Sequence, residues 1–537
     1  GGEALAEAGL RGATDPARSG AIVGNLSYPT ESLIEWAHGV WRGDQQGEAR
    51  NRFMSGLPIS EMAAGLGLGG PSFAIDSACA SSLYAIKLAC DRLQEGSADV
   101  MLAGGINRAD DLYLHVGFSS LKALSQSGQS RPFHAEADGL LPAEGAGVVA
   151  LRRLEDAIDD GQPIHGVIRG IGLSNDGRGD GILSPSPAGQ IRAMRAAYGD
   201  EVSPESVSFL ECHATGTPVG DPTEIASMAE VFGAGDESVA ISSLKANLGH
   251  LITASGAAGL IKVVEAMRHR TLPPTVNADE PHEAVGESPF ELVGDGRDWQ
   301  SDGPRRAGIN NFGFGGNNAH VLVEEWGEEA WEAGKVPTGE PTTDEPEEIA
   351  VVACEALTGE AETGRVETIE LDIASTQFPP ADLQESLPQQ LFLLQAARRL
   401  DGVLGGLPKE RTGVYVGMQC DGEVPRYQLR WVLENEGIDA DGIYPPLSAP
   451  GVVGHMPNIV ANRLNGQYDM KGPAYTVSAE EMSGPVGLSL ASRALQNGEV
   501  DAAVVGAVEM ACEPVQKRAI EAVTGESVAT ADAAVVM

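Results

Sequence analysis

Residues 75–82 read Ile-Asp-Ser-Ala-Cys-Ala-Ser-Ser, a short β-prone run that ends at Cys79 among small residues. The next segment, residues 82–94, has helical periodicity. The pattern predicts a strand, a turn and a helix, with the cysteine at the turn. A helix N-terminus offers free N–H groups and the positive end of the helix dipole, both of which favour thiolate over thiol. We expect a reactive cysteine here, although a lone cysteine in such a place is more often structural.

The sequence around this cysteine returns 402 residues later without a gap. Residues 93–99 (LQEGSAD) recur in the same frame as residues 495–501 (LQNGEVD). The position that matches Cys79 is occupied by Glu481. Because a carboxylate at this position cannot form the thioester that a thiolate forms, the duplication predicts a working half and a half whose nucleophile position is degenerate.

The repeat indicates two similar domains in tandem, because its period is far too long for a solenoid. Upstream, residues 18–24 match residues 411–417 at a shorter spacing, and both read as buried strands. The predicted units are a first domain over residues 1–325, a linker rich in Glu, Pro and Thr over residues 326–348, and a second domain over residues 349–537.

Both domains look incomplete. The first enters in a helix without an opening strand, and the second ends before any match to the first domain's later motifs. Residues 532–537 resemble residues 144–149 only weakly. These two segments lie about fifteen residues closer together than the 402-residue offset of the rest of the repeat. We therefore expect a shortened or missing loop in the second domain.

Composition limits the classes of protein that fit. The 537 residues are 42% apolar with 68 glycines, which is typical of packed α/β domains, and no apolar stretch approaches the roughly 20 residues of a membrane helix. A formal charge of −41 argues against a nucleic-acid partner. Six scattered cysteines without a CxxC pair indicate neither zinc nor disulfides, so we expect a cytoplasmic protein.

Two histidines lie in separate motifs downstream of the cysteine. His213 begins residues 213–221 (HATGTPVGD), and His250 ends residues 245–250 (KANLGH). Small and hydroxyl residues surround each, as a pocket needs where a ligand approaches the backbone. Either histidine alone would be interpreted as a buried structural residue. A third segment, residues 311–320 (NFGFGGNNAH), offers backbone N–H groups suited to an oxyanion hole.

In this order, the cysteine, the two histidine motifs and the glycine-rich segment resemble the β-ketoacyl synthases, which are thiolase-like condensing enzymes. The resemblance covers nearly all of residues 1–325, and Asn317 stands where the family commonly has threonine. It implies an α/β, five-layered α-β-α-β-α fold with the nucleophile on a buried helix end. With the duplication, it implies a tandem pseudo-dimer.

The resemblance also implies roles for individual residues. Cys79 would accept the acyl chain as a thioester, and His213 with His250 would promote malonyl decarboxylation and stabilise the enolate oxygen. The backbone N–H groups of Cys79 and Phe314 would form the oxyanion hole, and the Phe314 ring would gate the acyl pocket. The supporting residues would be Thr215 and Thr217, which hold the pantetheine arm, and Lys245 and Glu144, which act electrostatically.

This chemistry requires no metal and no redox cofactor, because loss of CO₂ supplies the carbanion and neutral histidines stabilise the enolate. The phosphopantetheine arm would be carried by the substrate, an acyl carrier protein loaded with acyl or malonyl groups. Other domains or subunits of a multienzyme synthase would be further partners.

The second half resembles a chain-length factor, which pairs with a ketosynthase and lacks its nucleophile. Both units on one chain, with residues 115–125 (HVGFSSLKALS) ahead of Arg131, most resemble the corresponding region of bacterial polyunsaturated fatty acid synthases. Chain-length factors often place glutamine where this chain has Glu481. The alternatives are another iterative polyketide synthase, a Cys-His thioester hydrolase, or a non-catalytic scaffold. A hydrolase would need only one of the two histidines.

Overall fold

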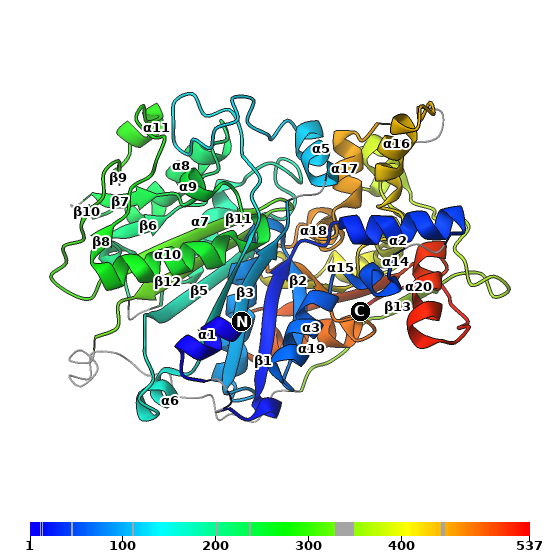
Figure 1. Ribbon diagram of the computed structural model, residues 1–537, viewed down its shortest axis with the longest axis horizontal. Coiled ribbons are helices and arrows are strands. Elements are labelled where there is room, and N and C mark those ends of the chain that lie inside the picture. The colour runs from blue at the N-terminus through cyan, green and yellow to red at the C-terminus, as the bar shows by residue number, and fades with distance from the viewer. Residues whose placement is uncertain are drawn as a thin grey trace.

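The computed structural model describes the chain except residues 11, 13, 45–46, 110–111, 200–201, 236–237, 328–347 and 442–445. Two mixed β-sheets organise it (Figure 1). The first half supplies strands to both sheets, whereas the described strands of the second half all belong to one of them. Most of the predicted linker, residues 326–348, lies outside the described residues.

A nine-stranded sheet runs without interruption through both halves, in the order β13-β17-β16-β14-β15-β2-β1-β3-β4. The halves join where β2 pairs antiparallel with β15, which places Thr476 opposite Asp76 and Val477 opposite Ile75. The expected pseudo-dimer is therefore intramolecular and built on shared backbone hydrogen bonds. Its strands are β1 (Ser19–Asn25), β2 (Ser72–Asp76), β3 (Val100–Asn107), β4 (Gly145–Leu151), β13 (Glu355–Thr358), β14 (Thr412–Gly417), β15 (Ala474–Ser478), β16 (Ala502–Glu509) and β17 (Ala533–Val536).

The second sheet has six strands in the order β5-β12-β11-β6-β7-β9 and belongs to the first half alone. These strands are β5 (Val167–Asn175), β6 (Phe209–Glu211), β7 (Val239–Ser242), β9 (Phe290–Leu292), β11 (Arg306–Gly313) and β12 (Asn317–Glu324). A two-stranded ribbon of β8 (Thr271–Leu272) and β10 (Arg297–Asp298) lies beside it.

Helices complete the five-layered α-β-α-β-α arrangement that the sequence predicts for the first half. Helices α4 and α10 pack between the two sheets, α1 and α3 lie against the outer face of the nine-stranded sheet, and α7 with α8 covers the six-stranded sheet. The helices of this half are α1 (Gly2–Glu7), α2 (Glu31–Arg42), α3 (Leu57–Leu66), α4 (Ser81–Gln94), α5 (Leu112–Ser120), α6 (Leu154–Asp159), α7 (Pro187–Ala196), α8 (Gly220–Phe232), α9 (Lys245–Leu248), α10 (Ser255–His269) and α11 (Glu283–Gly286).

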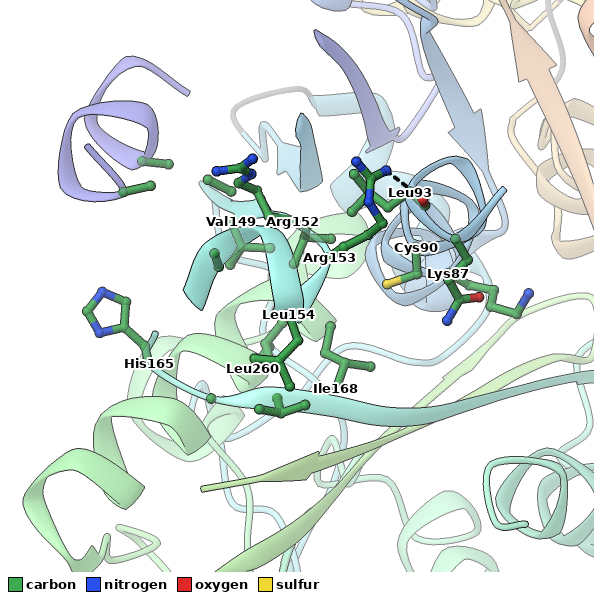
Figure 2. Close-up of a pocket in the computed structure, with 18 of the residues that line it drawn as sticks. Lys87, Cys90, Leu93, Val149, Arg152, Arg153, Leu154, His165, Ile168 and Leu260 are labelled. Carbon is green, nitrogen blue, oxygen red and sulfur yellow. Dashed lines mark hydrogen bonds between the residues drawn. The ribbon is translucent and has the colours of Figure 1, made fainter. Parts of the chain in front are cut away.

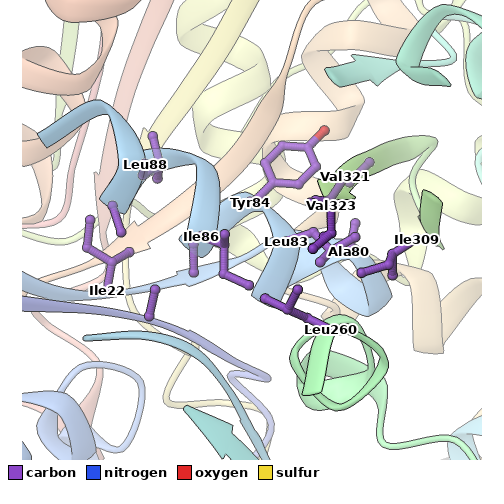
Figure 3. Packing of buried hydrophobic residues seen from close by; sticks show 14 of the residues in the cluster. Ile22, Ala80, Leu83, Tyr84, Ile86, Leu88, Leu260, Ile309, Val321 and Val323 are labelled. Atoms are coloured by element: carbon purple, nitrogen blue, oxygen red, sulfur yellow. The ribbon is translucent and has the colours of Figure 1, made fainter. Parts of the chain in front are cut away.

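The core between the sheets holds α4 in place. Figure 3 shows Leu83 and Tyr84 of α4 among buried side chains from α10 and both sheets, including Ile309 of β11 and Ile22 of β1. Each such aliphatic side chain contributes about 1.5–3 kcal/mol when fully buried. Gly256 permits the close approach of α10, because a Cβ there would lie 2.5 Å from the Leu83 side chain. This packing fixes the helix end that carries Cys79.

The duplicated segments fold alike, as the gapless frame predicts. Strands β2 and β15, helices α4 and α19 (Ser483–Gln496), and strands β3 and β16 each begin and end 402 residues apart. The residue before each nucleophile position has a left-handed backbone, with φ of 53° at Ala78 and 51° at Glu480. The frame therefore encodes the same strand, turn and helix twice.

The expected shortening of the second half's later loop is confirmed. The connection from β3 to β4 spans residues 108–144, and the one from β16 to β17 spans residues 510–532. Strand β17 also pairs with β13 on its other side, whereas β4 pairs only with β3 among the described residues. The two halves thus differ at this edge of the sheet.

The remaining helices belong to the second half. They are α13 (Pro380–Gln384), α14 (Pro388–Arg398), α15 (Asp401–Leu404), α16 (Arg426–Asn435), α17 (Ala449–His455), α18 (Ile459–Tyr468) and α20 (Pro514–Thr524). No helix in the described part of the chain is both long enough and apolar enough to cross a membrane.

Candidate active site

Cys79 lies in a single 3₁₀ turn, Ala78–Ala80, between the end of β2 and the start of α4. The left-handed backbone of Ala78 is uncommon for a residue with a side chain and costs about 1–3 kcal/mol. The carboxylate of Asp76 accepts a hydrogen bond from the Ala78 N–H at 2.9 Å, and the Asn311 amide donates to the Cys79 main-chain oxygen at 2.8 Å. The turn thus holds the sulfur at a buried helix end, where the sequence places it.

His250 is in direct contact with the sulfur. Its Nε2 lies 3.1 Å from Cys79 Sγ. The backbone N–H of Ile252 donates to His250 Nδ1 at 3.3 Å, and the Ser255 hydroxyl lies 3.1 Å from the same nitrogen. Because Nδ1 accepts a hydrogen bond, this network assigns the proton of the neutral ring to Nε2. His250 is therefore a hydrogen-bond donor toward the position of the reacting atoms.

His213 approaches the same point from the loop after β6. The ligand atoms of Cys79, His213 and His250 all lie within 4.8 Å of one another, and the two imidazole centroids are 5.5 Å apart. The Glu224 carboxylate on α8 accepts the N–H groups of His213 and Ala214, each at 2.7 Å. Glu224 was not among the residues expected at the site, although it stands three residues after the His213 motif.

Burial decides the protonation states in the site. It raises the pKa of the Cys79 thiol to about 12, against the opposing effects of Lys245 and of the Phe314 and Cys79 N–H groups. The expectation that the helix end favours thiolate is therefore wrong for the resting protein, because desolvation outweighs the helix dipole. Burial and then the charge of Lys245 lower the pKa of both His213 and His250, so both imidazoles are neutral near pH 7.

Lys245 lies where the resemblance implies it. The side chain is 5% exposed, and its Nζ donates to the main-chain oxygen of Cys212 at 3.3 Å. Burial lowers its pKa, while the carboxylates of Glu211 and Glu224 act in the opposite direction. Lys245 therefore contributes a positive field to the site without touching the sulfur.

The glycine-rich segment forms the other wall of the site. A Cβ on Gly313 would lie 2.6 Å from the Ser77 main-chain oxygen and 3.1 Å from the Cys79 nitrogen, so only glycine permits this approach. The N–H of Phe314 faces the Cys79 sulfur together with the N–H of Cys79 itself. The Phe314 ring packs on Phe118, with centroids 6.2 Å apart. Two N–H donors and an aromatic ring thus surround the thiol.

Thr215 and Thr217 lie together on the loop that follows His213. Their hydroxyl oxygens are 3.4 Å apart, and Thr215 is buried whereas Thr217 is partly exposed. The carboxylate of Asp221 accepts the backbone N–H groups of both residues. The loop therefore presents two neighbouring hydroxyls from a rigid backbone.

The structure does not bring Glu144 into this site. Its side chain is exposed just before β4, and no described hydrogen bond or ion pair joins it to Cys79 or to either histidine. The resemblance implied an electrostatic role for Glu144, but it is the neighbouring Ala143 that contacts the site, by donating a backbone hydrogen bond to the His250 oxygen. The backbone of this segment contacts the site, and the carboxylate does not.

Glu481 occupies the position equivalent to Cys79 but is exposed to solvent. Its neighbour Glu480, which has the left-handed backbone, points its carboxylate inward instead. The described residues of the second half include one histidine, His455, which bonds Tyr113 and not this turn. The second turn therefore has neither a thiol nor adjacent imidazoles.

The second half reaches the working site through other residues. The apolar cluster around Cys79 meets a second cluster, made of Val452, Val453, Met456 and Ile459, through the ring of Phe314. A Cβ on Gly117 of α5 would lie 3.6 Å from the Val452 side chain of α17. Helix α17 (Ala449–His455) therefore brings apolar side chains of the second half to the wall formed by Phe314.

A hollow of about 1900 Å³ lies away from these residues, between the outer edges of the two sheets (Figure 2). Strands β4 and β5 and helices α4, α10 and α19 line it, and its arginines Arg152 and Arg153 are held by acidic side chains. Its cysteine is Cys90, whose pKa is raised to about 12 by burial. The residues that line this hollow include His165 but neither His213 nor His250.

Sequence profiles of known families match most of the chain. The profile described as "Beta-ketoacyl synthase, N-terminal domain" matches residues 1–157 and again residues 347–529. The profile "Beta-ketoacyl synthase, C-terminal domain" matches residues 165–279. The N-terminal profile thus occurs on both sides of the sheet junction, and the C-terminal profile covers much of the six-stranded sheet.

Individual proteins and solved structures are also similar to this chain. A polyunsaturated fatty acid synthase subunit from Thraustochytrium sp. is 29% identical over 95% of this chain, and a PKS-NRPS hybrid synthetase from Aspergillus candidus is 40% identical over 59%. The chain spans 29% and 13% of their lengths. The solved structure "PfaC Keto synthase-Chain length factor" superposes with a TM-score of 0.87 at 29% identity, covering all of this chain and 68% of that one. A ketosynthase of the Bacillus subtilis bacillaene synthase gives 0.52 at 33% identity over 58% of this chain and 55% of its own.

Proposed function

Since the chain belongs to the β-ketoacyl synthase family, we propose that its first half catalyses decarboxylative Claisen condensation on Cys79. The reaction joins an acyl group held as a thioester to a malonyl group carried by an acyl carrier protein, giving a β-ketoacyl thioester and CO₂. The observation that carries the proposal is the convergence of Cys79, His213 and His250 within 4.8 Å, with both imidazoles neutral.

Acyl loading is a thioester exchange. The Cys79 sulfur attacks the acyl carbonyl, the bond from that carbonyl to the carrier's pantetheine sulfur breaks, and the departing thiolate takes the Cys79 proton. The N–H groups of Cys79 and Phe314 stabilise the negative oxygen of the tetrahedral intermediate.

Condensation begins when the malonyl carboxylate leaves as CO₂ and its bonding electrons form an enolate. His250 donates from Nε2 to the enolate oxygen, and His213 lies where it can do the same. The enolate carbon then attacks the acyl-Cys79 carbonyl, so that a carbon–carbon bond forms and the carbon–sulfur bond breaks. Cys79 leaves as thiolate and takes up one proton from the solvent, so that the condensation consumes one proton overall. Neutral imidazoles act here as hydrogen-bond donors to developing charge.

The tautomer assigned to His250 distinguishes a condensing enzyme from a thioester hydrolase. A Cys-His hydrolase needs an imidazole nitrogen that accepts the thiol proton. In this site, the His250 nitrogen that accepts a hydrogen bond is Nδ1, which is engaged by Ile252, while Nε2 faces the sulfur. A second histidine beside the first adds a donor that hydrolysis does not require. Both features favour condensation.

The substrates and partners follow from this reaction. The carrier's phosphopantetheine arm would pass the hydroxyls of Thr215 and Thr217, which lie on the same loop as His213. Residues 1–325 form the ketosynthase and residues 349–537 the chain-length factor, with α17 limiting the acyl chain. The likeness to a polyunsaturated fatty acid synthase subunit favours a fatty acid product over a polyketide. Six free cysteines fit a reducing cytoplasm.

The test is incubation of the protein with an acyl thioester and radiolabelled malonyl-acyl carrier protein. We expect release of labelled CO₂ together with a β-ketoacyl product of matching yield. A thiol and two imidazoles at these distances can also bind zinc, so the assay includes a chelator. Acyl release without carbon–carbon bond formation would establish a hydrolase instead, and absence of both reactions would establish a non-catalytic scaffold.

A further inference from the structure

We propose that Asp76 is a positioning residue for the nucleophile, whose buried carboxylate ties the Cys79 turn to the wall of the acyl pocket. This inference rests on the proposed function, because the group that it positions is the oxyanion hole of that reaction. Asp76 is the last residue of β2 and is 1% exposed. It touches neither the sulfur nor the histidines through a described hydrogen bond.

The carboxylate joins two backbone segments. Its Oδ1 accepts the Ala78 N–H at 2.9 Å, and its Oδ2 accepts the Ser27 N–H at 3.3 Å. Ser27 stands between Leu26 and Tyr28, whose side chains pack in the apolar cluster around Cys79. One side chain therefore fixes both the strained residue of the nucleophile turn and a segment of the acyl pocket.

Burying this carboxylate is costly. No described lysine or arginine lies within 4.0 Å of Asp76, so only backbone N–H groups compensate its charge. Burial raises its pKa to about 6, against those two hydrogen bonds. The charge also raises the pKa of the Cys79 thiol. Because burying this carboxylate costs stability, we infer that it has a role other than stabilising the fold.

The second half provides an internal control for that role. In both turns, a serine hydroxyl accepts one backbone N–H and donates to the oxygen of the left-handed residue. Ser81 does so with Ser77 and Ala78 at 2.9 and 2.6 Å. Ser483 does so with Ala479 and Glu480 at the same distances. The turn itself is therefore built identically in the two halves.

The halves differ at the position of Asp76. Its counterpart 402 residues later is Ser478, whose hydroxyl donates to the Met418 oxygen at 2.7 Å and makes no described bond to Glu480. The left-handed turn thus forms without a carboxylate where no nucleophile is present. Of the two turns, the one that carries Cys79 has the carboxylate. We therefore assign Asp76 a role in the reaction and not in forming the turn.

The physical reason lies in the orientation of the peptide groups. With the Ala78 N–H held toward Asp76, the Cys79 N–H is left facing the sulfur beside the Phe314 N–H. Donors that are already oriented stabilise a developing oxyanion without reorganisation. Without this bond, the turn is free to rotate its peptide groups, and acyl transfer should slow.

The test compares Asp76→Ser, Asp76→Asn and the matched variant Ser478→Ala. Serine is the residue that the second half uses in the same turn, so Asp76→Ser should fold with a melting temperature close to the parent's. We expect its acyl loading to fall about tenfold or more. Asparagine keeps one oxygen for the Ala78 N–H and should restore part of the rate. Ser478→Ala should load at the parental rate.

Two further readouts separate positioning from general damage. In a Cys79→Gln background, Asp76→Ser should decarboxylate malonyl-carrier protein as fast as the Cys79→Gln protein, because the histidines make no described contact with Asp76. Alkylation of Cys79 by iodoacetamide needs no oxyanion hole and should not slow. Three results would overturn the proposal. Asp76→Ser could load acyl groups as fast as the parent, or its rates of acyl loading and of alkylation could fall together. Asp76→Asn could also load no faster than Asp76→Ser. A parent that accepts no acyl group would refute the proposed function itself.

Discussion

The side-chain amide of Asn458 donates a hydrogen bond to the main-chain oxygen of Phe314 over 2.8 Å. Asn458 belongs to the second half and is fully buried, whereas Phe314 belongs to the glycine-rich segment of the first. The Phe314 N–H is one of the two donors that face the Cys79 sulfur. One wall of the working site is therefore held by the half that has no nucleophile.

Replacing Asn458 tests this dependence. Asn458→Ala leaves the buried Phe314 oxygen without its donor, which should cost about 1–3 kcal/mol of unfolding free energy. Acyl loading, measured by intact-protein mass spectrometry, should slow as the Phe314 N–H loses its orientation. The control is Asn497→Ala, because that amide also crosses between the halves, to Glu95 at 3.3 Å, but at the surface. Equal rates in the two variants would contradict the prediction.

Substitutions of Cys79 separate loading from decarboxylation. Cys79→Ala should abolish acyl loading and condensation, because the sulfur grouped with the two imidazoles within 4.8 Å is that of Cys79, whereas Cys212, the residue before His213, directs its sulfur toward Leu210 and Met228. Cys79→Gln should decarboxylate malonyl-carrier protein without condensing it, because the amide fills the space of the thioester and accepts no acyl group. Both outcomes are read from the mass of the intact protein and from CO₂ release. A stable acyl adduct on Cys79→Ala would exclude Cys79 as the nucleophile.

The histidines should act after loading. His213→Ala and His250→Ala should each slow malonyl decarboxylation by roughly 10²-fold, the usual scale for a lost oxyanion donor or acid–base group. Acyl transfer to Cys79 should suffer less, because its oxyanion hole is made of backbone N–H groups. Decarboxylation at the parental rate in either variant would make that histidine structural.

Chain length should respond to α17. Val452→Ala enlarges the apolar space opposite Gly117 and should shift the product distribution toward longer chains, measured by mass spectrometry, while the first condensation proceeds unchanged. The comparison is Glu481→Cys, which lies on the exposed turn of the second half. That variant should neither lengthen the products nor gain a second acylation site, since the described residues place no histidine beside it. If Val452→Ala makes products of the same chain lengths as the parent, α17 does not limit chain length.

The free energy of unfolding should fall as pH rises from about 4.5 to 7. Burial raises the pKa of Glu509 to about 7, with Arg52 opposing, from an ordinary value of 4.5. A carboxyl whose folded pKa is raised loses stability between its unfolded and folded values, here between about pH 4.5 and 7. Glu509→Gln should therefore reduce this loss and stabilise the protein above pH 7, as measured by urea unfolding. The control is Glu526→Gln at an exposed position, which should unfold with the same dependence on pH as the parent. The prediction is contradicted if Glu509→Gln also shows the parent's dependence of unfolding free energy on pH.

The sequence alone determined the local elements of the duplicated units. The strand, turn and helix around Cys79 and around Glu481 follow from short-range pattern, so the 402-residue offset predicted both copies with equal bounds. The resemblance carried by the motifs likewise implied that His213 and His250 act together, although they follow β6 and α9 on separate loops. Local periodicity and motif order suffice where neighbouring residues decide the backbone.

Only the tertiary structure decided what depends on burial and on distant contacts. The helix end was expected to favour the thiolate, but burial among apolar side chains raises the pKa of the Cys79 thiol and outweighs that effect. Glu144 turns to solvent, and the side chains that the second half packs against Phe314 come from α17 and the residues after it, not from the exposed turn at Glu481. Asn458 carried no signal in the sequence, since its bond to Phe314 forms only once the two halves pack together. Asp76 stands beside Cys79 in the sequence and differs from its counterpart Ser478, but the burial of its carboxylate is a property of the packed chain. Desolvation and contacts across hundreds of residues are properties of the packed chain, and no local pattern encodes them.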